Sequence, residues 1–184
     1  MPSDGWELTQ AVRTDTGMFG VWQPEHFAGV NSLDEWEDEV SEDAALLRHI
    51  EAGAFVPINI GGGGAYQFAV RFGDLATGLT ERELRYRIVS SRPYLLIANG
   101  QTSLGGLESV GQHAGISPVA LPTNPGRYVV TIHLIDWKAE PNAADSNVKP
   151  TTDALSDFVI EILPETGNEK YRSSLTTFDR PESS

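Results

Sequence analysis

The alternation of apolar and polar side chains along short segments is the feature that most constrains how this chain folds. Residues 65–72, AYQFAVRF, place aromatic or branched side chains at every second position. Side chains of a strand point alternately to its two faces, so a period of two predicts a strand with one buried face. The same period runs through WELTQAVRT, ERELRYRIVS, GRYVVTIHLI and DFVIEIL, at residues 6–14, 81–90, 126–135 and 157–163.

Turn residues separate these segments. Asp15-Thr16-Gly17 follows the first segment, and Asn99-Gly100 follows the apolar run PYLLIA. Such residues supply the backbone conformations that tight turns need. Residues 54–60, AFVPINI, reach four glycines just before the strand at 65–72, which predicts a hairpin with a four-glycine loop. About eight short strands with one helix predict a mainly β fold, either a β-sandwich or a partly open barrel.

One amphipathic helix is expected within residues 33–52. Apolar side chains recur there three or four positions apart, at Leu33, Trp36, Val40, Ala44 and Leu47. Ser41 followed by acidic residues could instead cap a shorter helix over residues 42–52. Gly53 would end either helix, because glycine readily adopts the backbone conformation that follows a helix C-terminus.

The chain length suits a single domain, since 184 residues are enough for one good core and few for two. We expect one β-rich domain over residues 1–165, with a polar loop at residues 139–153. Residues 166–184 lack an apolar period, so they are expected to form a disordered tail.

Composition excludes several classes of function. The formal net charge is −13, and a field of that sign repels nucleic acid and anionic lipid but attracts a basic protein. The absence of cysteine removes disulfides, thiolate metal sites and cysteine nucleophiles. Residues 1–10 lack the basic and apolar parts of a signal peptide, and no apolar run has the length of a membrane span. We therefore expect a cytoplasmic protein that contacts neither nucleic acid nor membrane.

Motifs for catalysis, metals and cofactors are weak. The four glycines precede a strand pattern and no lysine, so they do not form a phosphate-binding loop. No Gly-x-Ser-x-Gly motif occurs, and the four histidines show no metal-ligand spacing. The acidic residues could suit calcium by ligand type, but no EF-hand loop is present. We predict no cofactor and no metal, and we expect His133 to be either half-buried or a cross-strand residue.

The segment DEWEDEVSED, residues 34–43, carries seven acidic side chains and no basic one. One interpretation is the solvated face of a helix whose Trp36 packs inward. The other is a docking surface, because carboxylates around an aromatic anchor suit the basic cleft of a nuclease or toxin. The predicted partner-binding residues are Glu35, Trp36, Asp38, Glu39, Glu42 and Asp43.

The order of segments resembles that of the competence protein J family, small β-rich inhibitors of a DNA-entry nuclease, and of related bacterial immunity-type proteins. The resemblance rests on FGVW, DEWEDEVSED, EAGAFVPINI, RELRYRIV, LESV, LPTNPGRYVVTI and DFVIEIL, within roughly residues 16–163. It implies a non-enzymatic β-domain that binds and blocks a protein partner. Residues 139–153, the four glycines and the long tail have no counterpart in this pattern, and no functional residue is carried over.

Two further functions stay open beside an inhibitor or immunity-type protein. A domain that binds a small molecule or carbohydrate, with or without enzymatic activity, would use aromatic side chains at strand ends. Trp22 and Trp137 are its candidate ligand-binding residues. An accessory subunit would instead expose a contiguous apolar patch. The sequence leaves the partner and the oligomeric state undefined.

Overall fold

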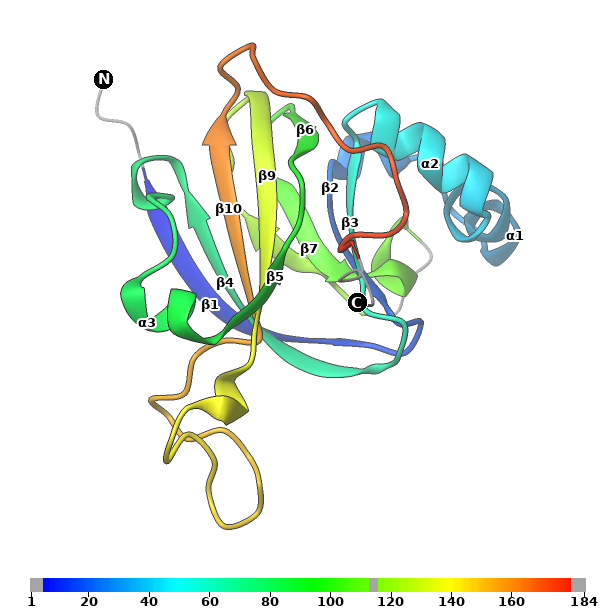
Figure 1. Cartoon of the computed structure of the whole chain (residues 1–184). Coiled ribbons are helices and arrows are strands. Elements are labelled where there is room, and N and C mark those ends of the chain that lie inside the picture. Colours follow the sequence, from blue (N-terminus) through cyan, green and yellow to red (C-terminus); the bar gives the residue numbers. More distant parts are fainter. Residues whose placement is uncertain (1–4, 113–115, 180–184) are drawn as a thin grey trace.

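Two β-sheets face each other across a shared core in the computed structural model, which describes residues 5–112 and 116–179 (Figure 1). This confirms the predicted mainly β class, with ten strands in the described residues where about eight were expected. The larger sheet has the order β1 (Trp6–Thr14), β4 (Gly64–Phe72), β10 (Phe158–Pro164), β9 (Gly126–Ile135), β5 (Arg87–Ser90), and β6 (Tyr94–Ala98) also pairs with β9. The smaller sheet has the order β3 (Phe55–Asn59), β2 (Met18–Trp22), β7 (Thr102–Gly106), β8 (Val119–Leu121).

A bent two-stranded ribbon joins the two sheets. Strands β1 and β4 pair in the larger sheet, and their continuations β2 and β3 pair in the smaller one. At the bend, the backbone N–H groups of Ile60 and Gly61 both donate to the carbonyl of Gly17. Gly17 has φ +81°, and a Cβ there would lie 2.9 Å from the backbone nitrogen of Gly62. The predicted hairpin between residues 54–60 and 65–72 is therefore wrong, because the glycines carry the chain from one sheet to the other.

The predicted alternation correctly identifies core residues on β4, β9 and β10, whereas Leu84 and Ile88 of the segment 81–90 are exposed. Phe68 on β4 stacks on Phe158 of β10 with ring centroids 5.0 Å apart, and Phe19 of β2 meets Phe68 edge to face at 4.9 Å. These rings join residues of both sheets in one buried cluster. Burial of aromatic side chains removes large apolar areas from water, so this cluster is a main source of stability.

The outer face of the smaller sheet is covered as well. The Phe55 ring lies directly over Gly20, since a Cβ at Gly20 would be 2.2 Å from the ring. Phe27, from a short 3₁₀ helix at Pro24–Phe27, packs edge to face on Phe55 and on His49. His49 belongs to helix α2 (Asp43–Glu51), which runs beside β3 (Figure 1). A helical layer therefore closes this side of the sheet.

The helix expected within residues 33–52 is present in three parts. Helix α1 (Leu33–Trp36) continues into a π-helical turn (Glu37–Ser41), and an extended Glu42 precedes α2. The π-helical turn and the extended Glu42 change which side chains of the following helix face the core. Helix α2 therefore buries Ala45, Leu46 and Ile50. Leu33 and Ala44 are exposed, so the predicted apolar face is only partly correct. The shorter alternative, residues 42–52, is close to α2.

Residues 81–86, predicted as part of a strand, form helix α3 (Glu81–Tyr86) before β5 begins. The hydroxyl of Thr80 accepts from the backbone N–H of Glu83, and the Glu83 carboxylate accepts from the backbone N–H of Thr80. This reciprocal capping box satisfies two N–H groups at the helix start and outweighs the alternating pattern. The Thr-x-x-Glu signal is present in the sequence.

Residues 166–179 do not form the disordered tail that the sequence predicts. They run across the edge of the molecule, from the end of β10 past β6 to β3 (Figure 1). Thr177 is only 1% exposed; its hydroxyl accepts from the Asn59 N–H and donates to the Pro57 carbonyl, both at 2.8 Å. Phe178 packs against the core. We call residues 166–179 the C-terminal strap; residues 180–184 lie outside the described part of the chain.

Candidate functional site

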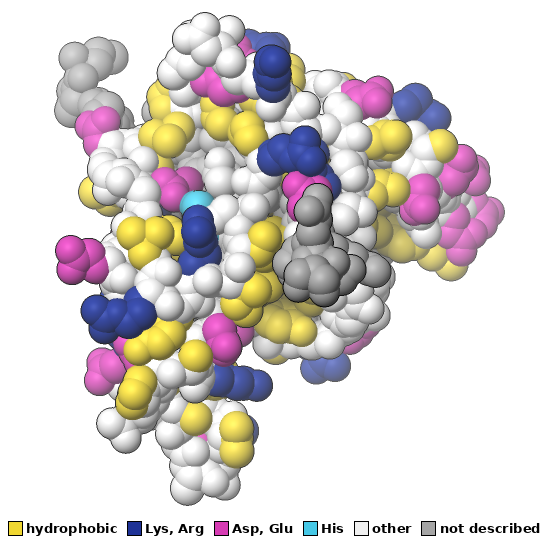
Figure 2. Space-filling view, in the orientation of Figure 1, with side chains coloured by type: hydrophobic (Ala, Val, Ile, Leu, Met, Phe, Trp, Pro, Cys, Tyr) yellow, Lys and Arg dark blue, Asp and Glu magenta, His cyan; other side chains and the backbone are white. Residues whose placement is uncertain are grey.

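The acidic segment, residues 34–43, forms the exposed end of the helical layer. All seven carboxylates belong to exposed residues on α1, the π-helical turn and the start of α2. Figure 2 shows acidic side chains gathered over this part of the molecule. Among the described residues, no arginine or lysine forms an ion pair with any of the seven. Their charge is therefore displayed to solvent without internal compensation.

Two contacts hold the start of the acidic segment. The Ser32 hydroxyl accepts from the backbone N–H of Glu35 and caps α1. The indole N–H of Trp36 donates to the carbonyl of Leu107 at 3.1 Å, and its ring packs against the core cluster. Trp36 thus anchors the segment to the β-sheets, and only the exposed part of its half-buried ring can touch a partner.

A histidine pair supports the other end of the segment. His49 on α2 lies with Nδ1 2.8 Å from Nε2 of His26, and its own Nε2 is 3.0 Å from the carbonyl of Glu39. The Glu39 carboxylate is 3.6 Å from the same nitrogen. Partial burial, and then the nearby His26, lower the pKa of His49 below its ordinary value. A neutral imidazole fits this bridge, because it donates at one nitrogen and accepts at the other.

The predicted partner-binding residues therefore lie together on one supported surface. Glu35, Asp38, Glu39, Glu42 and Asp43 are exposed within ten consecutive positions, whereas Trp36 is half-buried. Asp43 also stands in the first turn of α2, where a negative charge stabilises the helix. Stabilisation of α2 therefore gives a local structural reason for the acidic residue at position 43. This reason does not apply to the acidic residues of the π-helical turn.

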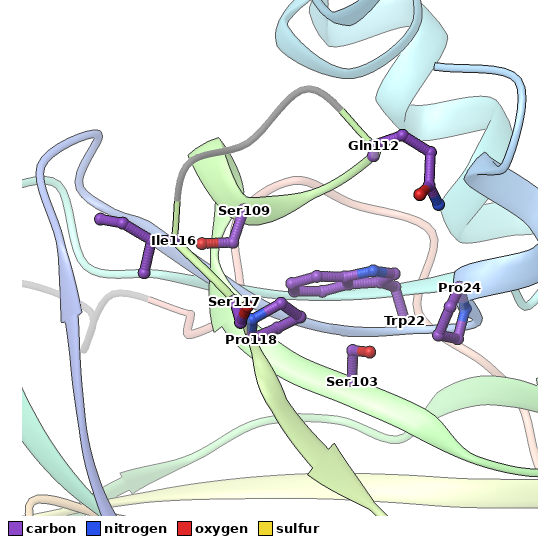
Figure 3. Close-up of a pocket in the computed structure, with 9 residues that line it drawn as sticks. Trp22, Pro24, Ser103, Ser109, Gln112, Ile116, Ser117 and Pro118 are labelled. Atoms are coloured by element: carbon purple, nitrogen blue, oxygen red, sulfur yellow. The ribbon is translucent and has the colours of Figure 1, made fainter. Parts of the chain in front are cut away.

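The two alternative ligand-binding tryptophans lie in different places. Trp22 borders a pocket of about 310 Å³ on the smaller sheet (Figure 3). Trp137 follows β9 of the larger sheet, is 7% exposed, and donates its indole N–H to the Asp157 carboxylate at 2.7 Å. The two side chains do not share a site, and the contact with Asp157 gives Trp137 a role in packing.

A polar array crosses the outer face of the larger sheet. The Glu161 carboxylate lies 2.8 Å from Nε2 of His133, whose Nδ1 is 2.6 Å from the Ser90 hydroxyl. His133 is 9% exposed, so it is buried rather than half-buried, and its contacts with Ser90 and Glu161 confirm the cross-strand alternative. The hydrogen bond with His133 is the main cause that lowers the pKa of Glu161. Sequence reasoning missed this array because its members come from β5, β9 and β10, which only the sheet order brings together.

The array follows the hydroxyl–imidazole–carboxylate order of hydrolytic triads. Its contacts nevertheless serve the fold. The backbone N–H of Gly78 donates to Glu161, which ties the segment before α3 to the sheet. Arg87 donates to the Ser90 hydroxyl, so that oxygen has two partners. These contacts satisfy polar groups that the sheet buries.

Within residues 5–112 and 116–179, no three histidine, aspartate or glutamate side chains are grouped so that they could hold a metal ion. No helix in the described part of the chain is long and apolar enough to cross a membrane.

The fold and the surface together define a class: a two-sheet β-protein with an acidic helical layer on one sheet and a C-terminal strap along its edge. Two solved structures share this fold. One, titled "Crocagin biosynthetic gene J", has a TM-score of 0.55 and 16% identity, and covers 90% of this chain and 99% of its own. The other is ComJ from Bacillus subtilis, an inhibitor of the DNA-degrading activity of NucA, with a TM-score of 0.51, 10% identity and coverage of 90% and 100%.

The likeness to ComJ agrees with the resemblance inferred from segment order. At these identities the comparison shows the fold alone. No protein-family model matches the chain, and no curated protein sequence matches it.

Proposed function

We propose that this chain is a cytoplasmic, non-enzymatic inhibitor or immunity-type protein that docks its acidic segment onto a basic protein partner. The partner is a nuclease or a toxin with a basic cleft. The observation that carries the proposal is the set of seven exposed carboxylates, held on a supported helical layer with no arginine or lysine partner in the described chain. The shared fold with ComJ, an inhibitor of a DNA-degrading activity, supports the same conclusion.

The physical basis is electrostatic complementarity. The net charge of −13 attracts a basic partner at long range, and the local concentration of carboxylates on the acidic segment orients it. Carboxylates that emerge from helices lose little conformational freedom on binding compared with the same groups on a loose loop. The half-exposed Trp36 lies among them and can add apolar contact area at the centre of the interface.

The test begins with capture of partners from a lysate of the native host at low and moderate salt. The captured basic protein is then purified and its association measured. We expect the association rate to fall steeply as salt rises from about 10 mM to about 150 mM, because the screening length shrinks from about 30 Å to about 8 Å. If the partner degrades DNA, the wild-type protein should inhibit that activity.

A matched pair of charge-reversal variants locates the interface. The substitutions Asp38→Lys and Glu42→Lys together should abolish binding and inhibition, with the melting temperature within a few degrees of wild type. The control carries Glu81→Lys and Asp136→Lys, two exposed acids at the α3 end of the larger sheet, and has the same net charge. We expect the control to bind nearly as tightly as wild type. Equal losses in both variants would contradict docking through the acidic segment and indicate a general effect of net charge.

A further inference from the structure

The pocket beside Trp22 lies on the outer face of the smaller sheet, and none of its described lining residues belongs to the acidic segment. Trp22 and Ser103 are cross-strand partners on β2 and β7, so their side chains share this face. Ser109, Gln112 and Ser117 contribute the other polar groups. Figure 3 shows the Gln112 carboxamide on the opposite side of the indole from Ser103. The volume of about 310 Å³ is at the lower end of the range of small-molecule sites.

Two hydroxyl groups in this pocket are buried and have no hydrogen-bond partner among the described residues. Ser103 is 4% exposed and Ser109 is 5% exposed. Both line the pocket, and neither side chain makes a hydrogen bond within the described part of the chain. Buried polar groups nearly always have a partner, and an unpaired one destabilises the fold. A ligand that bonds to these hydroxyls would remove this cost, which distinguishes the pocket from an ordinary surface hollow.

The lining also defines the chemistry of the ligand. Serine hydroxyls and the glutamine carboxamide both donate and accept hydrogen bonds, so they match groups that do the same. None of the described lining residues is charged, so an ionic ligand would lose hydration without gaining a counter-charge. Pro24, Ile116 and Pro118 supply apolar walls against which C–H groups can pack. Alternating hydroxyl and C–H groups are the surface of a sugar ring.

We propose that the pocket bordered by Trp22, Ser103 and Ser109 binds a neutral, polyhydroxylated ligand, namely a sugar or the sugar unit of a larger molecule. The described lining of this pocket includes none of the residues proposed for the protein interface. Ligand binding in this pocket does not require the acidic segment to bind a partner. Different measurements therefore test the two proposals.

The binding test uses saturation-transfer NMR and titration with D-glucose, D-galactose, N-acetyl-D-glucosamine and myo-inositol, and with glucose 6-phosphate as a charged probe. At least one neutral probe should bind wild type, and the phosphate should bind more weakly than glucose. The double substitution Ser103→Ala, Ser109→Ala should weaken binding by about tenfold or more, since it removes two hydrogen-bonding groups. The control Ser156→Ala changes a buried serine outside the pocket and should bind as wild type does.

The melting temperature of the free protein gives a second, ligand-independent result. Serines that serve a ligand are unpaired in the free protein, so Ser103→Ala and Ser109→Ala should leave the melting temperature unchanged or raise it. Serines that serve the fold would lower it. The proposal is overturned if both substitutions destabilise the protein, if no neutral probe binds, or if the double variant binds as tightly as wild type.

Discussion

Arg71 and Glu83 bury opposite charges against each other on the outer face of the larger sheet. Their side chains form two parallel hydrogen bonds of 2.8 Å. Burial alone would raise the pKa of Glu83, but hydrogen bonds from Arg71 and Thr80 lower it below its ordinary value. The pair therefore stays ionised, and removal of one partner would leave the other charge buried alone. Glu7 lies 3.4 Å from the same guanidinium but is about half exposed, so its contribution is smaller.

His49 makes a pH-dependent contribution to stability at the residue scale. The pKa of His49 is lowered in the folded protein, whereas in the unfolded chain it is about 6.5. The stability contributed by neutral His49 is therefore fully present above about pH 6.5 and is lost as pH falls below it, because the unfolded state then binds the proton more readily. His26, Glu39 and Arg48 are the ionisable groups that act on His49.

We predict that His49→Gln flattens the fall in stability between about pH 7 and about pH 5. The measurement is the free energy of unfolding from urea titrations at several pH values, compared with wild type. His26→Gln should reduce the slope only in part, because burial is the larger cause of the shift and His26 the second. Identical pH profiles for wild type and His49→Gln would show that His49 does not titrate in the expected window.

At the element scale, the C-terminal strap is held in place by hydrogen bonds and ion pairs, although its sequence has no apolar period. Tyr94 donates its hydroxyl to the carbonyls of Ser174 and Thr176, and Arg172 pairs with Asp179. The Thr177 hydroxyl then binds the backbone N–H of Asn59 and the carbonyl of Pro57 at the edge of β3. An exposed strand edge invites pairing with other chains, and the strap covers part of this one.

We predict that Thr177→Val destabilises the protein by about 1–3 kcal/mol, because it leaves the Asn59 N–H and the Pro57 carbonyl without their partner at nearly constant side-chain volume. Thr176→Val is the matched control: Thr176 is exposed, and its hydroxyl makes no hydrogen bond in the described chain. Urea denaturation of the three proteins measures the difference. A loss below about 0.5 kcal/mol for Thr177→Val would mean that the strap detaches readily.

At the scale of the whole molecule, charge is distributed unevenly. The net charge of −13 includes seven carboxylates on one supported segment, whereas the ion pairs of Arg71, Arg82 and Arg127 lie in other parts of the structure. Like charges held close together repel and destabilise the compact state. A protein that keeps such a surface therefore loses some stability to it.

We predict that the free protein gains stability as sodium chloride rises from about 10 mM to about 150 mM, because screening weakens repulsion within the acidic segment. Thermal unfolding followed by circular dichroism measures this. The less negative variant Asp38→Lys, Glu42→Lys should show a smaller gain, and the Glu81→Lys, Asp136→Lys control should lie nearer to wild type. A melting temperature that falls with salt would instead show that ion pairs dominate the electrostatic contribution.

Most strands could be predicted from the sequence, because side-chain alternation is a local consequence of strand geometry. The core positions Phe68, Phe158 and Val130 follow from it. The clustering of the acidic candidates could also be predicted, because these residues are near neighbours in the chain. Helix α3 also has a local sequence signal, the capping pair Thr80 and Glu83. The alternating pattern of the same segment predicted a strand instead.

Tertiary structure alone decided the features that depend on distant segments. It determined that the glycines at 61–64 cross between sheets, that Thr177 binds β3, and that Ser103 and Trp22 border one pocket. It also brought together Ser90, His133 and Glu161. The physical reason is that periodicity defines which face a side chain occupies, whereas pairing partners are chosen by the packing of both sheets around one core.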